Sequence, residues 1–452
     1  MAPTVRKGLL ASVRYAIAAH RNGLHGIPDD AYAAAWTEQS VLGWRFLLAN
    51  EPEAIRAILT ADEETTGKAR WVQRTIGPAL GDGLLSTEGE AWRRSRVVVQ
   101  PVFHPSRITA RHGAIVQAAE DLGARWRRAA AAGEGMRDAA PDLSQATREI
   151  LLALFFDPDF SDILARLGDL IPILQETAGR ARFKTLLGLP RWWPDRLGPA
   201  FHTSRKALNA ALDDAFARRR ADPTPHDDLP GRLLAAGAEA GLDDARIRAE
   251  ITTLFFAGYE TTANGMAWAV WELAQRPELA DAIRDELLAV TGGPLPAPDQ
   301  LASLGLANRV IHEVLRLYPP GWIVGRRALR PLDVPDGAGK TRRIRRGTTL
   351  NVASWVTHRS PLYWPDPARF DPDRFTEAAV ADRPRGIYYP FGHGPRACPG
   401  RGLALAEMTV LVALIARDFR LEPAGPAPQP LGRVTLRPGS PVMIRVTPRE
   451  AA

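Results

Sequence analysis

Cys398 is the only cysteine in this chain of 452 residues, and it lies in the segment 391–400, which reads FGHGPRACPG. One cysteine excludes an intrachain disulfide and any zinc or iron–sulfur site that needs several cysteines. Three uses of the thiol remain: a buried inert side chain, a nucleophile, or a single axial thiolate ligand to a metal cofactor. Gly394 and Gly400 allow tight turns on both sides, and Arg396 offers a nearby cation that favours thiolate over thiol. These surroundings favour the metal ligand.

The residues after the cysteine predict a long apolar helix. The run 401–415 consists mostly of Leu, Ala and Val, and its first turn would follow Cys398 directly. Because the amide groups at a helix N-terminus stabilise a nearby negative charge, this helix also favours a thiolate.

A second group of chemically useful residues lies in the middle of another predicted helix. The segment FFAGYETT places Glu260 and Thr261 beside the small residues Ala257 and Gly258. A glycine costs helix stability, and a threonine hydroxyl can hydrogen-bond a carbonyl one turn back. Taken alone, the segment is equally compatible with an amphipathic helix that turns a polar stripe to solvent.

The cysteine segment resembles the haem-binding loop of the cytochrome P-450 superfamily, the haem-thiolate monooxygenases. That loop follows the pattern Phe-x-x-Gly-x-Arg-x-Cys-x-Gly, and every defined place is filled, by Phe391, Gly394, Arg396, Cys398 and Gly400. The resemblance implies that Cys398 is the proximal ligand to the iron of haem b, with Phe391 and Arg396 beside the cofactor.

The segment around Glu260 is similar to the oxygen-activating segment of the same family, Ala/Gly-Gly-x-Asp/Glu-Thr-Thr. The resemblance implies that Thr261 hydrogen-bonds dioxygen or an adjacent water at the distal haem face, while Glu260 supplies protons from bulk solvent. Both would be catalytic, because cleavage of the O–O bond requires protons at the distal oxygen. The small residues Ala257 and Gly258 would let the helix backbone approach the porphyrin.

Cations for the haem propionates are expected at three places. Trp92 and Arg96 have the spacing of the family's Trp-x-x-x-Arg helix, which implies that they contact a propionate. The resemblance places a second arginine at Arg326, with Arg327 as the alternative, because neighbouring residues in a strand point to opposite faces. Arg396 would be a third partner.

A charged pair on a further predicted helix resembles the family's structural Glu-x-x-Arg motif. Glu313 and Arg316 are three residues apart and therefore share a helix face. The resemblance couples them to Arg374 in a later Pro-x-Arg-Phe segment, as a buried network that holds the proximal loop. Without the resemblance, the pair would be an exposed ion pair of little energetic value.

The activity implied by the resemblance is insertion of one oxygen atom from O2 into a lipophilic small molecule. The chain has no Gly-x-Gly-x-x-Gly nucleotide motif and no cysteine cluster, so electrons from NAD(P)H would arrive through a separate ferredoxin or flavoprotein. Substrate-facing positions are expected at 68–85, 254–257 and 322–324. Lys68, Arg70 and Arg74 could meet a substrate carboxylate, or the loop that holds them could be solvated.

Two rival functions stay open at this point. A peroxide-driven or isomerising haem-thiolate enzyme would need no reductase, but such enzymes can dispense with the Glu260–Thr261 pair. A non-catalytic haem protein, either a sensor or an electron carrier, would explain Cys398 but not an acid and an alcohol in the distal helix.

Composition narrows the partners and the location. The net charge is +7, but the basic residues are scattered through helical segments with no aromatic-interleaved stripe, which argues against nucleic-acid binding. There is no run of 18 apolar residues, so no transmembrane anchor is expected. The N-terminus lacks the apolar core of a secretion signal, and a single cysteine suits a reducing compartment, so we expect a cytoplasmic protein.

The order of the patterns predicts a mainly α fold with a small β-rich lobe, similar to the cytochrome P-450 fold, in a single domain that spans residues 1–452. Residues 243–275 predict a long central helix. The other expected elements are a strand at 41–48, a helix at 53–60, a long loop at 61–90, a helix at 92–99 ended by Pro101, mostly helix at 108–240 with breaks near Pro190, Pro194 and Pro223, strands and turns at 322–356, and an irregular segment at 357–397.

Overall fold

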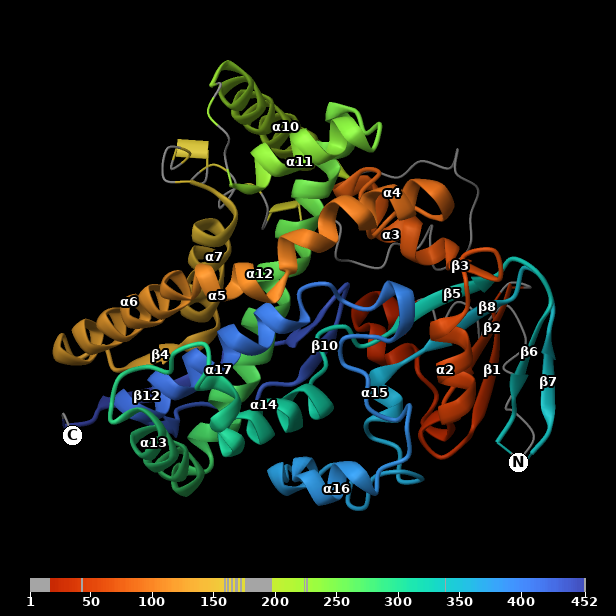
Figure 1. Ribbon diagram of the computed structural model, residues 1–452. Helices are drawn as coiled ribbons and strands as arrows, with labels where there is room; N and C mark the ends of the chain where they lie inside the picture. The colour runs from red at the N-terminus through yellow and green to blue at the C-terminus, as the bar shows by residue number, and fades with distance from the viewer. Residues whose placement is uncertain are drawn as a thin grey trace.

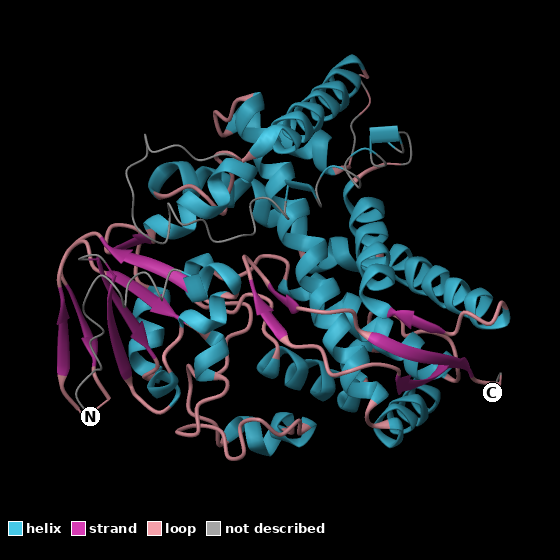
Figure 2. Cartoon of the chain, turned by 180° about the vertical axis from the view of Figure 1, so that it is seen from behind, coloured by secondary structure: helices cyan, strands magenta, loops and turns pink. Residues whose placement is uncertain are grey.

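The computed structural model describes residues 17–450 except 42–43, 158–159, 161, 164–165, 167–169, 171–172, 175–196, 223, 225–226 and 338. A helical body makes up most of the molecule, and a β-rich lobe lies at the N-terminal side (Figures 1 and 2). This arrangement confirms the predicted mainly α fold with a small β-rich lobe. In the part of the chain that is described, no helix is both long enough and apolar enough to cross a membrane.

The helices are distributed along the whole described chain. They are α2 (Pro52–Thr60), α3 (Arg70–Leu80), α4 (Gly89–Val99), α5 (Pro105–Ala110), α6 (His112–Ala131), α7 (Ala139–Phe155), α10 (Gly198–Ala221), α11 (Leu229–Glu239), α12 (Asp244–Ala274), α13 (Pro277–Thr291), α14 (Gly305–Leu317), α15 (Ser354–Thr357), α16 (Glu377–Ala381) and α17 (Arg401–Asp418).

A five-stranded sheet forms most of the β-rich lobe, in the order β1-β2-β8-β5-β3. Its strands are β1 (Trp36–Val41), β2 (Trp44–Ala49), β3 (Thr66–Lys68), β5 (Val324–Ala328) and β8 (Thr349–Val352). Only the β2–β8 pair is parallel, and the β3–β5 register sets Lys68 opposite Arg326. The smaller sheets consist of β4 (Met136–Asp138), β12 (Met443–Pro448) and β9 (Phe419–Pro423); β6 (Leu332–Pro335) and β7 (Thr341–Ile344); and β10 (Pro430–Gly432) and β11 (Leu436–Pro438).

The long helix α12 runs through the middle of the helical body, as predicted (Figure 1). Asp243 caps its start, because the carboxylate accepts a hydrogen bond from the backbone N–H of Arg246 at 2.8 Å. Buried residues occur on all sides of the helix, which packs against α7, α14 and α17. A helix that is apolar all round is typical of a core position, so α12 is the central support of the body.

Two local predictions were wrong. The segment 61–90 is not one long loop, because it contains β3 and then α3, which ends at Gly81 with a left-handed φ of 69°. Pro78 lies in the last turn of α3. The strand predicted at 41–48 is instead split between β1 and β2, which pair as a hairpin.

Other expectations agree with the structure. Helix α4 ends at Val99, and Pro101 lies in the short 3-10 helix η3 (Gln100–Phe103). The segment 357–397 is mostly irregular, with the short helices η6 (Pro372–Phe375), α16 and η7 (Gly394–Arg396). The breaks predicted at Pro190, Pro194 and Pro223 lie outside the described residues.

Candidate functional site

Cys398 lies in a tight loop between η7 and α17. The backbone N–H of Cys398 donates to the carbonyl of Phe391 at 2.9 Å, which closes the loop. Gly394 has a φ of 74°, and a Cβ atom there would lie 2.6 Å from the carbonyl oxygen of Leu59, so only glycine fits against the end of α2. The motif residues Phe391 and Gly394 therefore have a structural role, because they let the cysteine loop close and pack against the end of α2.

The sulfur is accessible, yet protein atoms surround it. Burial raises the pKa of the Cys398 thiol, while the backbone N–H of Gly400 and the charge of Arg96 oppose that rise. An accessible sulfur inside the protein suits a ligand to a group that is bound internally. A bound metal ion would supply the positive charge that keeps the thiolate form.

The cation beside the sulfur comes from Arg96 of α4, and the expectation that Arg396 would supply it was wrong. Arg96 also donates to the carbonyl of Ala397 at 3.0 Å, so it holds the cysteine loop as well. Arg396 instead donates to the carbonyl of Thr66 at 2.8 Å and lies over the ring of Trp92, 5.5 Å from its centroid. The structure thus brings Trp92, Arg96 and Arg396 together around the loop, and their contact with a haem propionate stays a prediction.

A cluster of buried cations lies next to this loop. Lys68 and Arg326 face each other across β3 and β5, and both are more than nine-tenths buried. Burial, followed by the charge of Arg396, lowers the pKa of Arg326 to about 9. Burial, followed by the charges of Arg326 and Arg396, lowers the pKa of Lys68 to about 7. The three side chains repel one another, and Glu88 is the carboxylate that offsets both shifts most strongly.

This cluster fits the two carboxylates of iron protoporphyrin IX. Within the described residues, the buried Nε of Arg326 has no hydrogen-bond partner, which is costly unless a bound group supplies one. Arg327, the alternative, lies 3.8 Å from Glu88, and among the described residues its buried Nε also has no hydrogen-bond partner. Arg326 is the more deeply buried of the two, and the choice between them stays a prediction. Lys68 was not predicted as a member of this cluster, because its position opposite Arg326 depends on strand register that the sequence did not reveal.

The residues predicted at the distal face lie together on α12. The hydroxyl of Thr261 donates to the carbonyl of Ala257 at 2.7 Å, as the helix geometry of threonine allows. The carboxylate of Glu260 accepts a hydrogen bond from Thr435 at 2.9 Å, and Asn264 donates to the same threonine at 3.3 Å. Thr435 precedes β11 and lies 175 positions from Glu260, so no spacing in the sequence indicated it.

Gly258 has a packing role that the sequence did not indicate. A Cβ atom at this position would lie 2.7 Å from a methyl carbon of Leu151 on α7. The missing side chain therefore lets α12 and α7 approach closely. A contact between Gly258 or Ala257 and the porphyrin stays a prediction.

A polar link joins α12 to α17. Thr262 hydrogen-bonds the side chain of Glu407, which is almost fully buried. Burial raises the pKa of Glu407 to about 8, because the hydrogen bond only partly offsets the loss of hydration. This carboxyl group was not singled out from the sequence, where it looks like one polar residue in an apolar helix.

The expected substrate-facing residues lie in different surroundings. Phe255 is buried and meets Phe155 edge-on, with ring centroids 6.2 Å apart. Trp322 lies in a small core cluster and donates to the carbonyl of Arg433 at 2.9 Å. Both rings therefore have core partners, and contact with a substrate stays a prediction for 68–85, 254–257 and 322–324.

The Glu313–Arg316 pair on α14 forms the buried network that was predicted. Both side chains are fully buried, and two hydrogen bonds of 2.6 and 2.7 Å join them. Arg374 of η6 lies 3.6 Å from the Glu313 carboxylate, which also accepts from the backbone N–H of Asp371 at 2.8 Å. Arg316 also donates to three carbonyls of the irregular segment, those of His358, Pro367 and Arg369.

Comparisons with known proteins agree on one family. The family model described as "Cytochrome P450" matches residues 40–445. "Cytochrome P450 4F4" of Rattus norvegicus is 31% identical over 88% of this chain and 80% of its own length. "Leukotriene-B4 omega-hydroxylase 3" of Mus musculus is 28% identical over the same shares. The solved structure titled "Crystal structure of a Cytochrome P450 (CYP102L1)" superposes with a TM-score of 0.79 at 26% identity and covers 93% of each chain.

Proposed function

Because the chain belongs to the cytochrome P450 family, and is therefore a haem-thiolate monooxygenase, we propose that it oxidises a lipophilic small molecule with electrons from a separate redox partner. Haem, when bound, supplies the redox-active iron at which dioxygen is activated. Cys398 would ligate that iron. Arg326, Lys68 and Arg396 would hold the propionates, next to Trp92 and Arg96.

The observation that carries this proposal is the pair Glu260 and Thr261 on α12. Because the Thr261 hydroxyl donates to the Ala257 carbonyl, its oxygen is left to accept a hydrogen bond from a water or a protonated group in the distal pocket. Glu260 is the residue before Thr261, and its carboxylate is held by a hydrogen bond from the hydroxyl of Thr435. A fixed hydroxyl beside a fixed carboxylate is an arrangement that can pass protons from solvent to the pocket.

The electron source and the substrate are proposed on chemical grounds. The chain has one cysteine and no dinucleotide motif, which supports a ferredoxin or flavoprotein that passes on electrons from NAD(P)H. The name of the mouse relative describes hydroxylation of leukotriene B4, which is a lipid, and this supports a lipophilic substrate here. A lone cysteine supports a cytoplasmic location.

The proposal is tested by measuring turnover with two oxidant sources side by side. Surrogate ferredoxin, its reductase and NADPH are supplied in one reaction and hydrogen peroxide in the other, with substrates chosen by the spin shift of the haem band. We expect product with the redox partners. Product with peroxide alone would favour the peroxide-driven alternative, and no product in either reaction would favour a non-catalytic haem protein.

The Thr261→Ala variant tests the proton pathway in the same assay. Loss of the hydroxyl should reduce product by about 10²- to 10⁴-fold, the usual contribution of a positioned proton-transfer group, while NADPH oxidation continues and hydrogen peroxide accumulates. Thr262→Ala is the matched control, because this hydroxyl bonds Glu407 instead. If Thr261→Ala gave as much product per NADPH as the unaltered protein and Thr262→Ala, the Thr261 hydroxyl would not be needed.

A further inference from the structure

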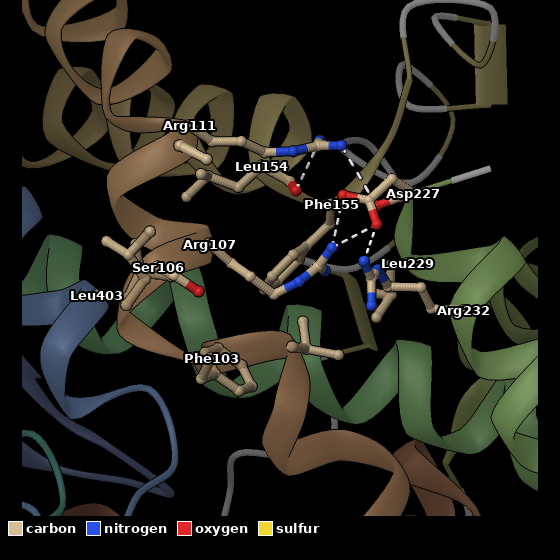
Figure 3. Close-up of a pocket in the computed structure, with 13 residues that line it drawn as sticks. Phe103, Ser106, Arg107, Arg111, Leu154, Phe155, Asp227, Leu229, Arg232 and Leu403 are labelled. Carbon is tan, nitrogen blue, oxygen red and sulfur yellow. Dashed lines mark hydrogen bonds and ion pairs between the residues drawn. The ribbon is translucent and has the colours of Figure 1, made fainter.

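A cleft of about 260 Å³ is lined by α5, α11 and the first turn of α17, among other elements (Figure 3). Its apolar floor comes from four elements: η3, α5, the end of α7 and the first turn of α17. The rings of Phe103 and Phe155 meet edge-on in it, with centroids 5.8 Å apart, next to Leu154 and Leu403. The floor can therefore accept the apolar body of a small molecule.

Three arginines converge on Asp227 at the rim of this cleft, two on its carboxylate and one on its backbone carbonyl, as Figure 3 shows. Both carboxylate oxygens of Asp227 lie 2.5 Å from Arg107, and Arg232 forms an ion pair with the same group. Arg111 donates to the backbone carbonyl of Asp227 at 3.3 Å and lies 3.7 Å from Asp157. Asp157 also pairs with an arginine of α10, so its charge is shared.

The positive charge of the lining exceeds the negative charge. Burial, and then repulsion from Arg107 and Arg111, lowers the pKa of Arg232. Among the described residues, the buried Nε of Arg232 has no hydrogen-bond partner. Among the described residues that line the cleft, Asp227 is the one acidic residue, and its side chain is 61% exposed. Binding of an anion in the cleft is therefore favourable, either beside the exposed Asp227 carboxylate or in its place as the partner of the arginines.

We propose that this cleft binds a small organic carboxylate, whose charged end takes the place of Asp227 and whose apolar body rests on Phe103 and Phe155. Arginine favours carboxylates because its planar fork donates two parallel hydrogen bonds. The volume lies below the range of about 300–1,000 Å³ that is typical of drug-sized ligands, so the ligand has the size of a benzoate or a short alkanoate. Asp227 is then an internal competitor for the site.

Ligand binding in the cleft is coupled to the haem ligand through Phe103. A Cβ atom at Gly400 would lie 3.3 Å from the Phe103 ring, so this ring packs directly on the loop two residues after Cys398. Leu403, one turn further into α17, lines the cleft as well. A bound ligand that moves the Phe103 ring therefore changes the surroundings of the thiolate, and a small shift of the haem absorption band reports it.

The experiment is a calorimetric titration of the haem-loaded protein with benzoate, after an azole has blocked the distal face. Benzamide, which has nearly the same shape but no charge, is titrated in parallel. We expect benzoate to bind at one site and to shift the haem band, and benzamide to bind at least about tenfold more weakly, as loss of a charge-assisted hydrogen bond requires.

Two variants in the cleft separate this proposal from general anion binding. Asp227→Asn should tighten benzoate binding by about two- to five-fold, because it removes an exposed competing ion pair. Arg107→Gln should weaken it by about tenfold or more. Arg220→Gln is the matched control, since Arg220 forms a surface pair with Asp244 outside the cleft and should leave benzoate binding unchanged.

The proposal is overturned if benzamide binds as tightly as benzoate, or if Asp227→Asn binds benzoate no more tightly than the unaltered protein. Arg107→Gln with unaltered affinity, at a melting temperature equal to that of Arg220→Gln, would overturn it as well. Arginine variants that change only the rate of electron transfer from a redox partner would identify the cleft as a protein-docking surface instead.

Discussion

Replacing Arg316 by alanine should destabilise the protein far more than replacing any exposed arginine. The guanidinium forms two hydrogen bonds with Glu313 and three with carbonyls of the irregular segment, at distances of 2.6–3.0 Å. Its removal leaves the Glu313 carboxylate buried with Arg374 as a distant partner at 3.6 Å. Breaking a buried pair in this way costs about 3–5 kcal/mol. At an unfolding entropy of about 2 cal/mol/K per residue, a chain of this length loses about 1 °C per kcal/mol, so melting should fall by about 3–5 °C.

The assay is thermal melting together with the haem content of the purified protein. Arg93→Ala is a matched control, because Arg93 and Glu90 have the same i,i+3 spacing and a similar distance of 2.9 Å but are both 58% exposed. Such a surface pair contributes about 0–1 kcal/mol, so this variant should melt within about 1 °C of the unaltered protein. If Arg316→Ala melted like Arg93→Ala and kept its full haem content, the buried network would not hold the proximal segment.

Substitutions at three further places test the site and its surroundings. Arg326→Gln should lower the haem retained after dialysis, whereas Arg327→Gln should not; equal loss in both would remove the special role of Arg326. Thr435→Val should raise the fraction of NADPH consumed without product, because it removes the hydrogen bond that Thr435 donates to the Glu260 carboxylate. Thr435→Ser should restore coupling, and unchanged coupling in the valine variant would contradict the positioning role. Burial raises the pKa of Glu407 to about 8, above its unfolded value, so the folded state holds a proton that the unfolded state releases, and stability should fall as the pH rises from about 4.5 to 8. Glu407→Gln should remove that slope in melting measurements, and a slope equal to that of the unaltered protein would refute it.

The sequence predicted those features that depend on local spacing. Each of these features is a short motif of a few consecutive residues, and the structure places each motif on the expected element. They are the cysteine loop, the Glu260–Thr261 pair on the long helix and the Glu313–Arg316 pair. Segment 61–90 was predicted as a loop because it is rich in glycine, and this composition obscured the short helix α3.

Contacts between distant segments could not be predicted. Lys68 meets Arg326 through strand register, and Thr435 reaches Glu260 from the other end of the chain. The cation beside the sulfur was assigned to Arg396, the nearest arginine in the sequence, although Arg96 of α4 takes that place. Each of these contacts depends on tertiary packing, which local sequence patterns do not indicate.

The measurement that tests the central claim most directly is the absorption spectrum of the reduced carbon monoxide complex. If the Cys398 thiolate ligates haem iron, the unaltered protein should show the band that gives the family its name. Cys398→Ala should lose that band, and Arg401→Ala, a change at the start of α17 that leaves the thiol in place, should keep it. A Cys398→Ala protein that kept the band would contradict the account.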